Sequence, residues 1–84
     1  MEGGLQMDLS TAIRKRIINL YTEKNMNINQ LAIKSGINPS TIRSIIKSRC
    51  NTPTTQTIYY LCIGFGISLK DFYNSKIFDN LDDN

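Results

Sequence analysis

The sequence predicts an all-α fold, a compact bundle of five short helices, on three observations. Apolar residues recur at intervals of three and four, as amphipathic helices require. Capping residues and glycines divide these runs into short segments. No segment has the pattern of a strand bounded by turns. With 84 residues, 40% of them hydrophobic, the chain can form one small core. We expect a flexible N-terminal extension at 1–7, a folded domain at 8–76 and an acidic tail at 77–84.

The first two helices are predicted from periodicity and from caps. The first spans about residues 9–24, where apolar side chains repeat at helical spacing: Leu9, Ala12, Ile13, Ile17, Leu20 and Tyr21. The second begins after Asn27, an N-cap residue, with Gln30 placed to complete a capping box. It ends at Gly36, which suits the left-handed position after a helix, and is therefore about eight residues long.

The third helix is expected at about 39–47. Asn38 can cap it, and Pro39 can occupy its first position, where a missing N–H costs nothing. Ile37 before the cap and Ile42 inside the helix form a hydrophobic staple, which sets the angle at which the helix begins.

Two more helices follow a loop. Thr54 is the predicted N-cap of the fourth helix and Gly66 its stop, and Gly64 is expected to weaken the last turn. Ser68 caps a short fifth helix with Asp71 in its first turn. The aromatic residues are expected in the core and its seams rather than as platforms for single-stranded bases: Tyr21, Tyr59, Phe65, Phe72 and Tyr73.

Composition argues against several classes of protein. The chain contains no histidine, and its two cysteines, Cys50 and Cys62, lack CxxC spacing, so neither a zinc site nor a histidine-based active site is expected. We expect no enzyme activity, no cofactor and no small-molecule ligand. Neither a membrane span nor a signal peptide is evident, so a cytoplasmic protein with two reduced thiols is expected, Cys62 packing as a small hydrophobe. A disulfide between them stays an alternative.

Charge is unevenly distributed along the chain. Residues 14–49 contain eight Lys or Arg against one acid, whereas the other six acids lie on either side of this window. A basic centre of this kind suggests a polyanionic partner, and a solvated charged surface is the alternative. The same two readings apply to the run from Arg14 to Arg16, whose side chains a helix turns toward different faces.

Two short helices joined by a tight turn with a glycine are the components of a helix-turn-helix. Ile42, Ile45 and Ile46 define the inward side of the third helix at about 100° per residue. Polar and basic residues occupy the other side: Ser40, Arg43, Ser44, Lys47 and Ser48.

The segment INQLAIKSGINPSTIRSIIKSRCNTPTTQTIYYLCIGFGISLKDFY resembles the helix-turn-helix of lambda repressor and Cro-like regulators, the xenobiotic-response-element type. The shared features are Leu31-Ala32, Gly36, Ile42 with Ile45, Pro53 and the closing GISLKDFY. The resemblance covers about residues 9–73. It implies a lambda-repressor-like bundle whose third helix enters the major groove of an operator, in a homodimeric transcriptional regulator that acts as a repressor.

Site residues are carried over from this resemblance. The base-reading candidates are Ser40, Thr41, Arg43 and Ser44. For Arg43, contact with guanine and contact with a phosphate are equally open, and a third possibility is neither. The candidates for contact with the DNA backbone are Asn27, Asn29, Lys47, Arg49, Asn51 and Thr52. A protein-interaction module on the same scaffold, such as an antitoxin or an inhibitor of another regulator, is the alternative function.

Overall fold

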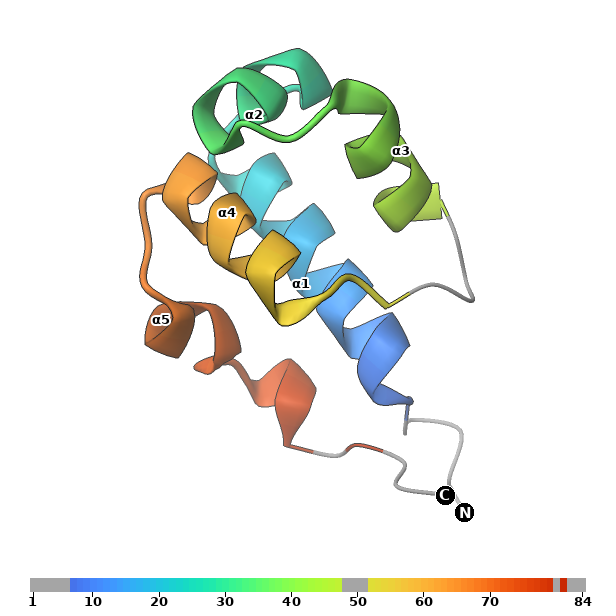
Figure 1. Cartoon of the computed structure of the whole chain (residues 1–84). Helices are drawn as coiled ribbons and strands as arrows, with labels where there is room; N and C mark the ends of the chain where they lie inside the picture. The colour runs from blue at the N-terminus through green and yellow to red at the C-terminus, as the bar shows by residue number, and fades with distance from the viewer. Residues whose placement is uncertain (1–6, 48–51, 80, 82–84) are drawn as a thin grey trace.

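The computed structural model describes residues 7–47, 52–79 and 81, and these residues form a helical bundle (Figure 1). In chain order its elements are α1 (Leu9–Glu23), α2 (Ile28–Ser35), α3 (Pro39–Lys47), α4 (Thr55–Phe65), α5 (Leu69–Tyr73) and the short 3₁₀ helix η2 (Lys76–Phe78). The described residues contain no strand, only an isolated bridge between Met7 and Leu81. The all-α prediction with five α-helices is therefore confirmed.

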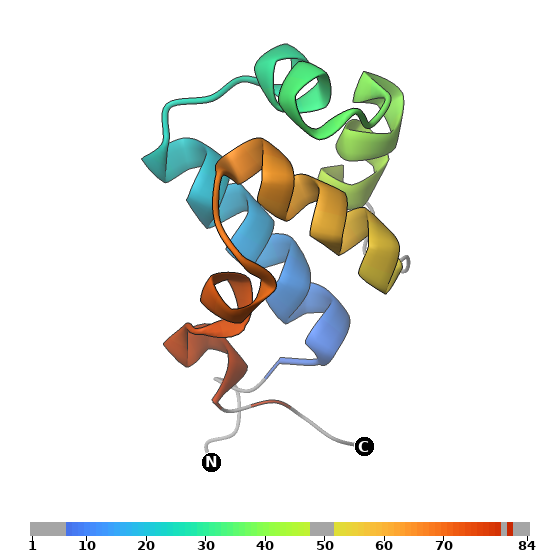
Figure 2. The ribbon, with the colours of Figure 1, turned by 60° about the vertical axis from the view of Figure 1, so that its left-hand side comes forward.

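The helices surround a single apolar core. In two views α4 lies across α1, while α2 and α3 lie at one end of the bundle and α5 and η2 at the other (Figures 1 and 2). Ile17 of α1, Leu31 of α2, Ile42 of α3, Leu61 of α4 and Phe72 of α5 are all fully buried in this core. Every α-helix therefore contributes to the same core, which holds α2 and α3 in a fixed relation to the rest.

Capping residues begin and end these helices where the sequence predicts. Asn27 and Gln30 form a complete capping box, with bonds of 2.8 and 3.0 Å. Thr54 and Ser68 accept hydrogen bonds from backbone N–H groups three residues later. Gly36 and Gly66 adopt left-handed conformations that residues with a Cβ rarely take, which explains both helix stops. The predicted caps at Asn27, Thr54 and Ser68 are confirmed.

Gly64 has a packing role that the sequence did not reveal. A Cβ at this position would lie 2.9 Å from the Cβ of Ser35 and 3.0 Å from Cδ1 of Leu31, both in α2. It would also lie 3.2 Å from the backbone nitrogen of Ser35. Gly64 therefore allows α4 to approach the backbone of α2 closely, a benefit that opposes its low helix propensity.

The aromatic residues do not all lie in the core. Phe65 and Phe72 are buried and Tyr21 packs against the core, as predicted. Tyr59 is 50% exposed, so its predicted place in the core or its seams is wrong. Tyr73 is 40% exposed, but its ring contacts those of Phe72 and Phe78 at the edge of the core, as predicted. The reason for Tyr59 is helical geometry, because it lies on the side of α4 turned away from Ile58 and Leu61, which face the core.

The core continues beyond α5 into the segment expected to be tail. Phe78 of η2 packs against the core and lies 6.2 Å from the ring of Phe72 and 5.2 Å from that of Tyr73, measured between ring centroids. Such tilted contacts between aromatic rings are favourable. Phe78 therefore covers one end of the bundle.

Arg16 attaches α1 to α5. Its guanidinium donates to the carbonyl oxygen of Phe72 at 2.7 Å and to that of Asp71 at 2.8 Å. These carbonyls belong to the last turn of α5, where helix geometry leaves backbone acceptors free for other donors. The carbonyl of Asp71 also accepts from the N–H of Asn74 at 3.2 Å. Two interpretations were open for the run from Arg14 to Arg16, a solvated surface and a contact with a partner. Neither predicts that Arg16 stabilises the fold.

Cys62 is a free thiol buried in the core. Burial raises the pKa of this thiol, and the positive charge of Arg16 lowers it by less. The thiol therefore stays protonated near neutral pH. The prediction that Cys62 packs as a small hydrophobe is confirmed. Cys50 lies outside the described residues.

Candidate nucleic-acid interface

A tight turn fixes the start of α3 relative to α2. After the left-handed Gly36, the carboxamide oxygen of Asn38 accepts a hydrogen bond from the backbone N–H of Ser40 at 2.9 Å. The carbonyl oxygen of Asn38 accepts from the N–H groups of Thr41 and Ile42 at 3.0 and 3.2 Å. Pro39 has no N–H to satisfy in the first turn. The predicted cap at Asn38 is therefore present, and it determines where α3 begins.

α3 separates an apolar side from a polar side. Ile42 and Ile45 are buried in the core, and Ile46 packs partly buried against it. The four predicted base-reading residues are all exposed, as is Lys47 at the end of the helix: Ser40, Thr41, Arg43, Ser44 and Lys47. At helical spacing Ser40, Ser44 and Lys47 lie along one line. α3 therefore presents a surface of hydroxyls and cations that the core does not use.

Ser40 has a second role in this surface. Its hydroxyl donates to the carboxamide oxygen of Asn38 at 2.8 Å, while its backbone N–H bonds the same oxygen. A serine hydroxyl has one proton to donate and two lone pairs that accept. With its proton engaged by Asn38, Ser40 can offer an external partner only an acceptor.

The structure brings Arg43 next to the start of α2. Arg43 and the two asparagines at the N-terminus of α2 line one open depression of about 470 Å³, whose other residues are Tyr21, Met26 and Ile28. The carboxamide oxygen of Asn27 is bonded to the N–H of Gln30, so its amide protons remain available as donors. Asn29 is exposed beside it. Three predicted DNA contacts therefore lie around the same concave surface.

Thr52 lies in a different part of the molecule from this depression. Its hydroxyl forms a short hydrogen bond with the hydroxyl of Ser10, in the first turn of α1. Thr52 therefore connects the segment before α4 to the start of α1. The other two candidates from this loop, Arg49 and Asn51, lie outside the described residues.

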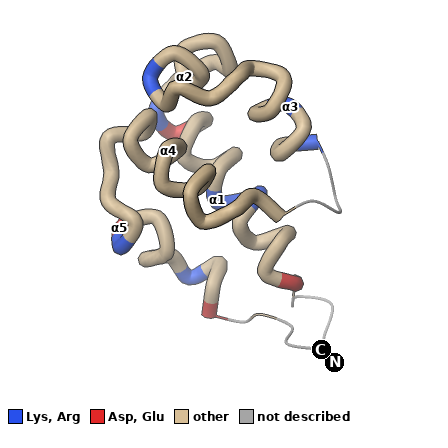
Figure 3. Tube along the Cα trace, viewed as in Figure 1, with Lys and Arg blue, Asp and Glu red and all other residues tan. Residues whose placement is uncertain are grey.

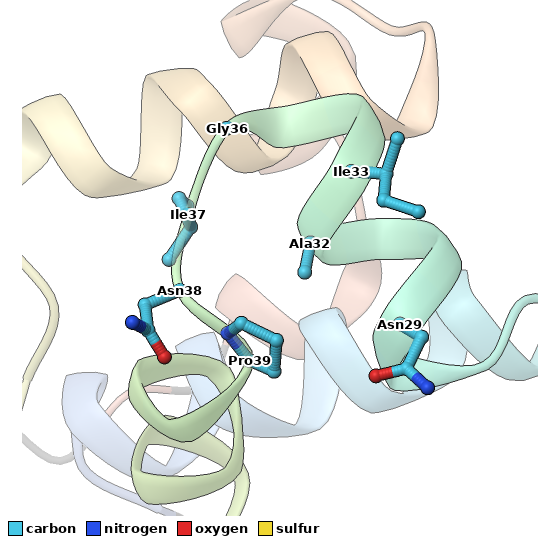
Figure 4. A pocket seen from close by; sticks show the side chains of 7 residues that line it. All are labelled: Asn29, Ala32, Ile33, Gly36, Ile37, Asn38 and Pro39. Carbon is cyan, nitrogen blue, oxygen red and sulfur yellow. The ribbon is translucent and has the colours of Figure 1, made fainter.

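A second open depression, of about 700 Å³, lies between α2 and α3 (Figure 4). Its lining is mostly apolar: Asn29, Ala32, Ile33, Gly36, Ile37, Asn38 and Pro39. Ile33, at its margin, is 82% exposed, more than any other large hydrophobic residue among those described. Ile33 is not among the predicted site residues, although helical periodicity, with Leu31 and Ala32 turned inward, indicates an outward side chain for it.

Positive charge lies on the helices around the two depressions, although among the described residues Arg43 is the one cation that lines either of them. Lys and Arg occur on α1, α2 and α3, the helices that form or adjoin both depressions (Figure 3). Among the described residues, His, Cys, Asp and Glu form no group of three or more that could hold a metal ion. No helix in the described ranges is both long enough and apolar enough to span a membrane.

Taken together, α2, the glycine turn and α3 define a helix-turn-helix protein with a polar, basic outer surface on its second helix. Residues 16–75 match the family of Cro/C1-type HTH DNA-binding domains, well over half of the chain. The chain belongs to this family, and the resemblance inferred from its sequence is confirmed. DNA binding is the defining property of the domain.

A solved structure supports the same assignment. The chain is similar to the crystal structure of the prophage Lp1 protein 11, with 30% sequence identity and a TM-score of 0.71. The similarity covers 83% of this chain and 92% of that one. No curated protein matches the chain.

Proposed function

We propose that this protein is a sequence-specific regulator of transcription, acting as a repressor, that inserts α3 into the major groove of double-stranded DNA. The observation that carries the proposal is the exposed side of α3, where the hydroxyls of Ser40 and Ser44 share a face with Lys47, opposite the buried isoleucines. A helix displayed in this way by a helix-turn-helix can enter the groove and reach base edges.

Different residues would supply affinity and specificity. Lys47 and the N-terminus of α2, with Asn27 and Asn29, would hold the sugar-phosphate backbone. Ser44 and Thr41 would read base edges with short hydroxyl side chains, and Ser40 would contribute its free lone pairs. Such side chains discriminate weakly between bases, so DNA shape would add to the specificity.

For Arg43 two roles remain open, a contact with a phosphate of the DNA backbone and a contact with a guanine edge. Arg43 shares its depression with the asparagines that begin α2, which supports a phosphate contact. A bidentate contact to guanine would instead contribute about 1–3 kcal/mol of discrimination against other bases. The two roles give different outcomes when arginine is removed, since loss of a phosphate contact weakens all sequences alike.

The proposed partner is an operator of near-palindromic sequence bound by a homodimer. Two copies of α3 would then lie about 34 Å apart, one turn of DNA. The role is one of binding rather than catalysis, with no cofactor and no small-molecule ligand, and it suits the cytoplasmic location expected from the sequence.

Selection of bound duplexes from a random pool at physiological salt tests the proposal directly. We expect a consensus with two related half-sites. Ser44→Arg should change the preferred bases, while Lys47→Ala should weaken binding to all duplexes and reduce the slope of log affinity against log salt by about 1. Weak and equal affinity for every duplex, unaltered by Ser44→Arg, would exclude sequence-specific regulation.

One observation favours a second candidate function, a protein-interaction module such as an antitoxin or an inhibitor of another regulator. Ile33 stands exposed beside the mostly apolar depression between α2 and α3, and apolar surfaces of this kind can receive a protein partner. If Ile33→Glu binds DNA as tightly as the wild type, and affinity falls with salt as described for the wild type, the result favours a DNA-binding regulator over a protein-interaction module.

A further inference from the structure

The side chain of Asn38, which caps α3, is bonded at one end only. Its carboxamide oxygen lies 2.9 Å from the backbone nitrogen of Ser40 and 2.8 Å from the Ser40 hydroxyl oxygen. A backbone N–H only donates, so the atom that it meets must be the oxygen, and this fixes the orientation of the amide group. The exposed NH₂ group bonds no acceptor among the described residues. In Figure 4 the nitrogen of Asn38 points away from α3 and the oxygen points toward it.

The same two bonds determine which hydrogen bonds Ser40 can still form. Because the carboxamide oxygen can only accept, the proton of the Ser40 hydroxyl must lie between the two oxygens. Ser40 therefore offers an outside partner lone pairs and no proton. Asn38 offers N–H protons and no lone pair, since Ser40 engages both lone pairs of its oxygen. We call these two side chains the Asn38–Ser40 pair, which presents one donor group and one acceptor group joined by a hydrogen bond.

One of the four bases matches this pair in the major groove. Adenine presents the N7 acceptor beside the N6 amino donor. Guanine presents two acceptors, N7 and O6, so its O6 would meet the lone pairs of Ser40. Cytosine presents a donor alone, and thymine presents an acceptor beside a methyl group. An asparagine can contact adenine with both ends of its own amide, but here its oxygen is occupied and Ser40 supplies the acceptor instead.

We propose that the Asn38–Ser40 pair determines specificity by selecting adenine, with Asn38 donating to N7 and Ser40 accepting from the N6 amino group. The inference rests on the proposed function, because the pair meets a base only if α3 enters the major groove. Asn38 and Ser40 are both exposed at the start of α3, and the N-terminal residues of a recognition helix are those that contact base edges. Pro39 between them has a fixed φ and no N–H, so it adds no competing donor.

Selection of duplexes from a random pool by the full chain, as wild type and as Asn38→Asp, tests the proposal. Aspartate is an equally good N-cap and can accept both bonds from Ser40, but at neutral pH it has no proton to donate. The variant therefore presents acceptors only, which suit the N4 amino group of cytosine. We expect adenine at one position of each wild-type half-site, and at that position Asn38→Asp should prefer cytosine over adenine by about tenfold.

A base analogue tests the contact from Asn38 without any change to the protein. Replacing the selected adenine by 7-deazaadenine removes the N7 acceptor and keeps the amino group. Wild-type affinity should fall about fivefold, the effect of losing one hydrogen bond. Asn38→Asp should bind the two duplexes equally, because it has no donor for N7. Removing the amino group instead, with purine in place of adenine, should weaken wild-type binding by a similar factor through the loss of the bond to Ser40.

Asn29→Asp is the matched control, since it makes the same change of charge at another exposed asparagine, in the first turn of α2. It should weaken binding to all duplexes alike by repelling phosphates, and it should leave the selected bases unchanged. The same consensus for wild type and a folded Asn38→Asp, or wild-type affinity unaffected by 7-deazaadenine, would overturn this inference and leave the proposed function intact. A wild type that selects no consensus would overturn both. The analogue measurement on the wild type decides the question even if Asn38→Asp does not fold.

Discussion

Arg16 illustrates how a residue in a basic segment can serve the fold. Its two hydrogen bonds to the carbonyls of Asp71 and Phe72 hold the end of α5 against α1. Arg16→Met keeps most of the aliphatic stem and removes both bonds, so we expect unfolding free energy to fall by about 1 kcal/mol. Thermal unfolding should show a Tm lower by about 5 °C. The neighbouring exposed Lys15, changed to Met, should have little effect, and equal losses in the two variants would contradict this role.

Asp8 gives a prediction about pH. Hydrogen bonding from Thr11, from its side chain and then from its backbone N–H, lowers the pKa of Asp8 from its ordinary 3.8, with smaller help from Arg14. A lowered pKa means that the ionised cap stabilises the fold above pH 3.8 and that this contribution is lost as pH falls through the folded-state value. Asp8→Asn should therefore lower Tm at pH 7, and the difference from wild type should vanish once the pH falls below the folded-state pKa of Asp8. A constant difference across a pH titration would contradict the assignment.

The residue-level site was only partly predictable. The exposure of Ser40, Arg43 and Ser44 follows from helical periodicity alone, because their isoleucine neighbours define the buried side. The neighbours of Arg43 do not follow from it, since Asn27 and Asn29 reach the same depression only when α2 is packed on α3. The bond from Ser40 to Asn38 depends on the turn geometry between the two helices. Local patterns predict which way a side chain points, and tertiary packing decides what it meets.

Helix α4 shows the same limit at the level of elements. Its bounds were predictable because Thr54 and Gly66 are local signals. The role of Gly64 was not, because the atoms that exclude a Cβ belong to α2, about thirty residues earlier in the chain. Residues of this kind look like defects in a single helix. They become understandable only once the partner helix is known.

Gly64→Ala should therefore destabilise the protein, although alanine is the better helix former. The propensity gain of about 1 kcal/mol is opposed by overpacking against Leu31 and Ser35, where a backbone nitrogen cannot move aside easily. We expect a net loss of about 1–2 kcal/mol in urea unfolding. Thr55→Ala, in the exposed first turn of α4, should change stability by less than about 0.5 kcal/mol. A more stable Gly64→Ala variant would show that the approach of α2 and α4 can relax.

At the scale of the whole molecule, charge is unevenly divided over the surface. Cations lie on α1, α2 and α3 around the proposed DNA surface and also on α5 and η2, whereas α4 carries none (Figure 3). The same chain thus combines a surface attractive to phosphates with a helix that carries no charge. In the proposed homodimer, each copy strengthens the binding of the other, because the DNA holds both copies at a high effective concentration.

Spacing of the half-sites tests this arrangement as a whole. Inserting about 5 bp between the half-sites of a selected operator places them on opposite sides of the duplex, so that two bound copies cannot pair. Wild-type affinity should fall to that for a single half-site. Fluorescence anisotropy would compare four duplexes: a single half-site, the original operator, and operators with insertions of about 5 and about 10 bp between the half-sites. Wild-type binding that ignores the insertion would show that the two copies act independently.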